Sequence, residues 1–141
     1  MSATVVALLG YIGVMLVLLL ILAGLRVGLT VMGKAPASGF APGGDDVSPF
    51  SARLCRAHAN SYEFFPIVGG LLLYGLATGQ SSITNGLAIF LLGARVLQSI
   101  THLASSSAMA VRLRFAFFLV QFLIAGYWLY LFFMASGENY M

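Results

Sequence analysis

The stretch VVALLGYIGVMLVLLLILAGL, residues 5–25, decides the class of this protein. It contains no charged residue, and at about 1.5 Å of helix rise per residue it is long enough to cross a hydrocarbon core of about 30 Å. A cleaved signal peptide is the alternative, but no basic residue precedes the run, and the run exceeds the usual apolar region of such a peptide. We therefore expect a retained membrane-spanning helix over residues 5–26.

The rest of the chain has the composition of a membrane protein. Of its 141 residues, 60% are hydrophobic and only 8% are charged, whereas about a quarter of a soluble domain is charged. The net charge is +3, but the basic residues are scattered, which argues against a nucleic-acid-binding face. The single cysteine, Cys55, offers no disulfide partner and no metal-ligand spacing. We expect an integral membrane protein in contact with lipids, with no nucleic-acid partner and no metal site.

Three further apolar runs follow the first. They cover residues 57–78, 83–103 and 113–134, and a long loop, residues 27–56, precedes them. The loop is rich in Gly, Pro and Asp, which end or turn regular structure. Because lipid offers no partner to open backbone groups, spanning segments are helices or closed barrels. The sequence therefore predicts an all-α integral membrane protein, a four-transmembrane-helix bundle that forms a single domain over residues 1–141.

The basic residues predict the orientation of this bundle. Basic residues near helix ends concentrate on the cytoplasmic side of a membrane. In this chain they fall in the first and third connections, at Arg26, Lys34, Arg53, Arg56, Arg112 and Arg114. We expect a multi-pass protein with the loop 27–56 in the cytoplasm and both termini on the non-cytoplasmic side, in the cytoplasmic (inner) membrane if the protein is bacterial.

Polar side chains inside the second and third runs recur at helical spacing, which places each set on one helix face. The two sets are Arg53, Arg56, Asn60 and Glu63, and Arg95, Gln98, Ser99 and His102. A charge that faces lipid costs about 2.5 to 3.5 kcal/mol, so both faces should point inward, and we expect a salt bridge between Glu63 and Arg95. Two polar faces that start from one membrane side predict a hydrated or ligand-filled crevice open to the cytoplasm.

A purely structural role for these residues is the alternative. Polar side chains join membrane helices by hydrogen bonds that contribute about 0.6 kcal/mol each, and this role suits the Glu63 and Arg95 pair taken alone. The remaining basic residues at the rim outnumber the acids there, and an unpaired basic cluster attracts an anion by charge and by bidentate hydrogen bonds. We therefore expect an anionic ligand, although Arg53 and Arg112 can also serve only to set the topology.

The polar faces lie in motifs that resemble those of a known family. The motifs are RAHANSYEFFP at residues 56–66, ARVLQSITH at 94–102 and LRVGLTVMG at 25–33. Over about residues 10–130 the chain resembles the MAPEG family, the membrane-associated proteins in eicosanoid and glutathione metabolism, and within it the bacterial members. The resemblance implies a homotrimer of four-helix protomers, with glutathione as co-substrate held between subunits near the cytoplasmic side.

The resemblance also implies a set of residues that bind glutathione. Carried over to matching positions, they are Arg26, Arg56, Asn60, Glu63, Arg95, Gln98 and His102. Arg56, Asn60 and Glu63 match residues that contact glutathione, and Arg95 matches the arginine that pairs with the second-helix glutamate. His102 falls where relatives often place a tyrosine. An arginine-rich pocket with an amide and a carboxylate suits an anionic tripeptide that carries an amine.

For the catalytic arginine the resemblance leaves two candidates, Arg112 and Arg114. A guanidinium beside the thiol would stabilise the thiolate, which would then attack a lipophilic small molecule that arrives from the membrane. The implied activity is that of a membrane-bound glutathione transferase or peroxidase-like enzyme, with glutathione as its only cofactor.

Three positions depart from the glutathione-using pattern. Ala59 replaces a further arginine, Gln98 replaces a histidine, and phenylalanines replace a tyrosine in the first turns of the fourth helix. These changes weaken thiol binding and activation. The alternative function is therefore a noncatalytic membrane protein of the same fold, which binds a lipid head group or acts as a partner in a larger membrane complex.

Overall fold

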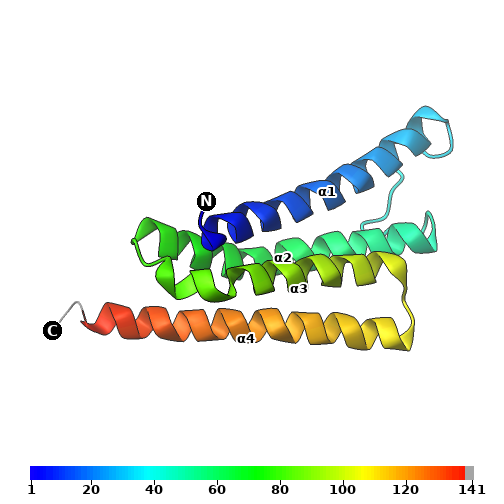
Figure 1. The fold of residues 1–141 in the computed structure, drawn as a ribbon. Helices are drawn as coiled ribbons and strands as arrows, with labels where there is room; N and C mark the ends of the chain where they lie inside the picture. The colour runs from blue at the N-terminus through cyan, green and yellow to red at the C-terminus, as the bar shows by residue number, and fades with distance from the viewer. Residues whose placement is uncertain (139–141) are drawn as a thin grey trace.

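The computed structural model describes residues 1–138 and consists of four helices (Figure 1). They are α1 (Ala3–Val31), α2 (Pro49–Ala77), α3 (Ser82–Ala104) and α4 (Ala108–Glu138). The start of α1 and the end of α4 lie at one end, and the connections 32–48 and 105–107 lie at the other (Figure 1). The expected all-helical fold is confirmed. Residues 139–141, which the predicted domain 1–141 includes, lie outside the described residues.

The largest difference from the expected helix bounds is at the start of α2. This helix begins at Pro49 rather than near residue 57. The Ser48 side chain accepts a hydrogen bond from the backbone N–H of Ser51 at 3.0 Å, and a proline in the first turn has no N–H that needs a partner. The connection is therefore residues 32–48 instead of the expected 27–56, and Arg53 and Arg56 belong to a helix.

Three of the helices are long and apolar enough to cross a membrane. They are α1, α3 and, within α4, residues Ala108–Gly137. The helix α2 is as long as α1, but it does not qualify by the same standard, and even its more apolar part, residues 60–77, contains Asn60 and Glu63. The expected span 57–78 lies within this more polar helix except for its last residue, Thr78, which caps the helix.

The helices α2 and α3 form a central pair, with α1 on one side and α4 on the other (Figure 1). Helix α1 packs on both members of the pair, whereas α4 packs mainly on α3 and touches α2 more lightly. Within residues 1–138, the backbones of α1 and α4 do not approach each other. A single chain therefore has α1 and α4 on two separate outer sides of the central pair.

The apolar core consists of two clusters with polar residues between them. The larger lies toward the start of α1 and contains Ala7, Tyr11, Phe64, Val68, Leu72, Ala88, Leu91, Ile124, Ala125, Trp128 and Phe132. The smaller lies near the connection 32–48 and contains Leu18, Leu22, Leu54, Cys55 and Ala57. Because lipid tails are as apolar as leucine, these contacts stabilise the bundle by close packing rather than by removing area from water.

A polar network fastens α1 to α3 at the end where the chain starts. The Thr4 hydroxyl lies 2.6 Å from the Thr84 hydroxyl and donates to Asn85 Oδ1 at 2.8 Å. Next to it, Gly79 has a φ of +71° in the turn between α2 and α3, a conformation that a side chain disfavours. This end of the bundle is closed by hydrogen bonds, and the candidate site lies toward the other end.

Candidate functional site

The site is built on a buried arginine. Arg95 of α3 is 0% exposed, and its Nη1 donates to Asn60 Oδ1 on α2 at 2.8 Å. The guanidinium carbon lies 5.0 Å from the ring centroid of Tyr11 and 6.0 Å from that of Phe64, which is within the range of a cation–π interaction. Nε and Nη2 have no hydrogen-bond partner in the described part of the chain. A positive charge therefore sits inside the bundle, held by an amide and two aromatic rings.

The partner of Arg95 is Asn60 and not Glu63. The two α2 residues are three positions apart, so they differ by about 60° around the helix. Asn60 faces the bundle, whereas Glu63 is exposed. An amide accepts a hydrogen bond from Arg95 without the desolvation cost of burying a carboxylate. The predicted salt bridge between Glu63 and Arg95 is therefore wrong within this chain.

A second buried pair joins α3 to α4. Gln121 is 0% exposed and Gln98 is 2% exposed. Gln121 Nε2 donates to Gln98 Oε1 at 2.8 Å and to the backbone carbonyl of Phe117 at 2.9 Å. Sequence reasoning missed Gln121, although a lone amide in a long apolar run is a signal by itself, because polar groups inside membrane helices face the bundle.

A groove of about 330 Å³ lies beside these two pairs. Its lining comes from α2, α3 and α4, and consists of Asn60, Gln98, His102, Val111, Arg114, Phe115 and Phe118. Arg114 Nη1 lies 3.0 Å from His102 Nδ1, and because a guanidinium only donates, the ring nitrogen accepts. Arg56 and Arg95 also act on the His102 ring by their charge. The groove therefore combines a basic rim with an aromatic wall.

Three of the seven residues expected to bind a ligand line this groove, and two more lie next to it. Asn60, Gln98 and His102 line it together with Arg114, Arg95 lies beside its Asn60 wall, and Arg56 is exposed near it. Of the two candidate catalytic arginines, only Arg114 lines the groove. Arg112, two positions earlier on α4, is exposed and is not part of the lining.

Arg26 lies elsewhere. Its Nη2 donates to the backbone carbonyl of Ala41 at 3.3 Å, and its guanidinium carbon lies 5.6 Å from the ring centroid of Phe40. It lines a separate cavity between α1 and the connection 32–48. Since the backbones of α1 and α4 do not approach each other, Arg26 and Arg114 do not share a site within one chain.

Arg53 has a structural role. Its Nε donates to the backbone carbonyl of Leu103 at 2.9 Å, which satisfies one of the carbonyls left open in the last turn of α3. The guanidinium carbon also lies 5.8 Å from the ring centroid of Phe50. Arg53 therefore joins the start of α2 to the end of α3 and is held away from the groove.

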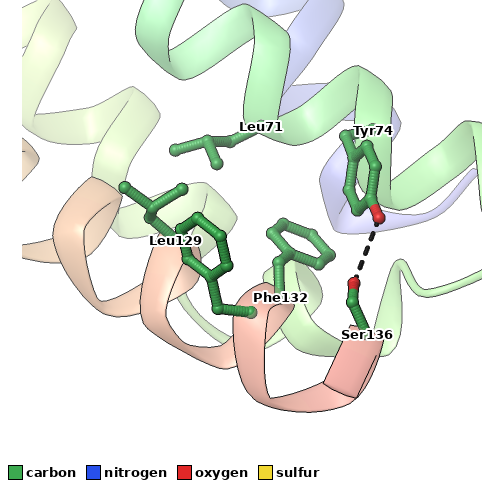
Figure 2. Close-up of a pocket in the computed structure, with 6 residues that line it drawn as sticks. Leu71, Tyr74, Leu129, Phe132 and Ser136 are labelled. Atoms are coloured by element: carbon green, nitrogen blue, oxygen red, sulfur yellow. Dashed lines mark hydrogen bonds between the residues drawn. The ribbon is translucent and has the colours of Figure 1, made fainter. Parts of the chain in front are cut away.

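A second cavity, shown in Figure 2, lies between α2 and α4 toward the end of α4. Leu71, Leu129 and Phe132 give it an apolar wall, and the Tyr74 hydroxyl lies 3.3 Å from the Ser136 hydroxyl at its edge. None of the residues expected to bind a ligand or to act in catalysis lines it. The basic groove, and not this cavity, holds the expected ligand-binding residues Asn60, Gln98 and His102.

Comparison with known proteins gave one match. The model of the MAPEG family matches residues 4–134, nearly the whole chain. No curated protein and no solved structure matched. Together with the three helices able to span a membrane, the match identifies an integral membrane protein, and it confirms the resemblance seen in the helical motifs.

Proposed function

The chain belongs to the MAPEG family, and from this premise we propose that it is a membrane-bound glutathione transferase or peroxidase-like enzyme. Glutathione is its co-substrate, and a lipophilic electrophile from the membrane is its second substrate. The observation that carries the proposal is the basic groove, where Arg114 contacts His102 beside the amide of Asn60. An anionic tripeptide rich in hydrogen-bond acceptors suits this combination of cations and amides.

Arg114 is the residue we assign to the thiolate. Its guanidinium stabilises the negative sulfur and so favours the ionised thiol. His102 supports this role because its Nδ1 accepts from Arg114 and holds the guanidinium in one orientation. The sulfur then forms a bond to an electrophilic carbon, and the electron pair of the broken bond leaves with the departing group. Arg56 and Asn60 bind the remainder of the tripeptide.

A neighbouring subunit completes the site in this proposal. Arg26 and Glu63 are the two expected ligands that do not reach the groove of their own chain. Glu63 is exposed on α2, and α1 lies across the central pair from α4. A homotrimer, with α2 as its fourth spanning helix and the connections 32–48 and 105–107 in the cytoplasm, would bring these residues from one chain to the groove of the next.

Calorimetry with glutathione on the purified protein in lipid nanodiscs tests the proposal. Replacing Arg114 by Gln removes a charged hydrogen-bond donor, worth about 1.5 to 3 kcal/mol, so the Kd should rise by about tenfold or more. Arg112→Gln removes the same charge from an exposed position of the same helix, and its Kd should stay within about twofold. Absence of binding heat from the unaltered protein would remove the proposal, and equal losses in both variants would contradict the role of Arg114.

A phospholipid head group is the second candidate ligand. The observation in its favour is the aromatic wall of the groove, where Phe115 and Phe118 stand beside Val111. Among the described residues 1–138, no tyrosine lines the groove. Native mass spectrometry separates the two candidates. A protein that retains phospholipid and never glutathione is the noncatalytic member of the family.

A further inference from the structure

Two amides that line the groove have their orientation fixed by groups behind them. For Asn60 the fixing group is Arg95, whose Nη1 lies 2.8 Å from the amide. A guanidinium has five N–H donors and no acceptor, so the atom that Asn60 turns toward it must be the oxygen. The amide nitrogen of Asn60, which donates two hydrogens, therefore points away from Arg95.

For Gln98 the fixing group is Gln121, and the argument has two steps. One amide atom of Gln121 lies 2.9 Å from the backbone carbonyl oxygen of Phe117, and because that oxygen only accepts, the Gln121 atom is the nitrogen. The same nitrogen lies 2.8 Å from Gln98, so Gln98 turns its oxygen toward Gln121. The amide nitrogen of Gln98 is left for other partners.

Both free nitrogens reach the groove. Neither Asn60 Nδ2 nor Gln98 Nε2 has a hydrogen-bond partner within residues 1–138, yet neither is among the buried polar atoms without a partner. Both residues line the groove. His102 adds a third donor when its ring is neutral, because Nδ1 accepts from Arg114 and the proton then sits on Nε2.

We propose that Arg95 and Gln121 are positioning residues that turn the polar wall of the groove into a surface of hydrogen-bond donors only. Such a wall binds a group that only accepts, a carboxylate or a thiolate, and disfavours an ammonium group. The identification of the bound molecule as glutathione rests on the proposed function. Because the wall only donates hydrogen bonds, we assign a carboxylate or the sulfur of glutathione to this wall. The amine of glutathione is excluded from it.

A double-mutant cycle tests the role of Gln121, with glutathione as the probe and the full chain in nanodiscs. In Gln121→Met, Gln98 is free to rotate and to present its oxygen to the ligand, so the Kd should rise about fivefold. In a Gln98→Met background the same change should have no further effect, because the residue through which Gln121 acts is absent. An equal rise with and without Gln98 would overturn the positioning role.

The third glutamine of the chain provides the matched control. Gln80 lies in the turn between α2 and α3, at the end of the bundle away from the groove, and Gln80→Met should leave the Kd unchanged. A rise in Kd for this variant equal to that of Gln121→Met would also count against a specific role for Gln121.

A second experiment uses the unaltered protein and needs no glutathione. The side-chain NH₂ signals of Asn60 and Gln98, assigned by their loss in Asn60→Leu and Gln98→Met, are followed by NMR during titration with sodium acetate and, separately, with methylammonium chloride. Acetate should shift both pairs of signals and methylammonium should not. Shifts with methylammonium alone, or with neither salt, would overturn the inference. Shifts with acetate in a protein that does not bind glutathione would support the donor wall and remove the proposed function.

Discussion

Arg95 shows how one residue can organise the interior of a membrane bundle. It is fully buried, and it holds Asn60 by a hydrogen bond and Tyr11 and Phe64 by ring contacts. Three properties of the guanidinium are in use at once: the charge, the flat face and the Nη1 donor. A lysine at this position would keep the charge and a donor but would lose the flat face.

We therefore expect Arg95→Lys to lower the free energy of unfolding by about 1 to 3 kcal/mol, through loss of the planar ring contacts and a weaker hydrogen bond to Asn60. Thermal unfolding of the two proteins in the same detergent measures the change. Arg112→Lys, at an exposed position, should change the stability by less than about 0.5 kcal/mol. Equal stabilities of Arg95→Lys and the unaltered protein would show that the flat face is not used.

The two arginines near the start of α2 should separate stability from binding. Arg53 satisfies a carbonyl of α3, so Arg53→Gln should lower the free energy of unfolding by about 0.5 to 1.5 kcal/mol and leave the Kd for glutathione unchanged. Arg56 is exposed beside the groove, so Arg56→Gln should raise the Kd and leave the stability unchanged. Unfolding curves and calorimetry on both variants check this, and the opposite pattern would reverse the two assignments.

At the scale of the elements, the start of α2 depends on one glycine. Gly44 has a φ of +73°, and a Cβ added to it would lie 2.6 Å from Cys55 Sγ and 2.8 Å from the backbone oxygen of Ser51. The connection 32–48 therefore packs directly on the first turns of α2, which only a residue without a side chain permits.

Gly44→Ala should destabilise the protein by about 1 to 3 kcal/mol, because it adds backbone strain and forces the connection away from α2. Gly43→Ala is the matched control, since its Cβ would meet nothing closer than Asp45 Oδ1 at 3.4 Å. Thermal unfolding compares the two, and a similar midpoint for both variants would contradict the packing described here.

The sequence could predict the helices but not the start of α2. Long apolar runs located each helix, because lipid permits little else. The Gly- and Asp-rich stretch 42–46 suggested that the loop continued. The charges of Arg53 and Arg56 interrupt the apolar residues that follow, so the start of the helix was not recognised. The pair Ser48 and Pro49 is nevertheless a typical helix start, and it is the feature of the sequence that indicates where α2 begins.

The candidate site was also predictable only in part. Helical spacing placed Asn60 on the polar face of one helix and Gln98 and His102 on that of the next, and these three residues line one groove. The spacing could not resolve the rotation of about 60° that separates Asn60 from Glu63. Arg112 and Arg114 point about 200° apart on a helix, and choosing between them requires knowing which face of α4 meets α3. Gln121 follows Arg114 by seven residues, which places the two on one face of α4, and this spacing was the sequence signal for Gln121.

At the scale of the whole molecule, the separation of α1 from α4 makes the proposed assembly testable. Arg26 and Arg114 lie on opposite sides of the central pair. If one glutathione contacts both, the two residues come from different chains, and a head-to-tail ring supplies that geometry.

Co-expression of an Arg26→Ala chain with an Arg114→Ala chain should therefore restore binding that neither chain shows alone. With random mixing, roughly a quarter of the sites would combine an intact Arg26 with an intact Arg114. Calorimetry on the mixed and the separate preparations measures the glutathione bound per chain, and this value gives the fraction of sites in which both arginines are intact. Mixed oligomers that bind no more than the separate ones would place both arginines outside a shared site.

The large apolar cluster below Arg95 gives the bundle one more property. Trp128, Leu72 and Leu91 are wholly buried, and with their neighbours they form an apolar layer between the buried polar residues and the end where the chain starts. Because a charged molecule gains nothing from crossing such a layer, an ionised interior in a single chain is compatible with a membrane that keeps its electrochemical gradient.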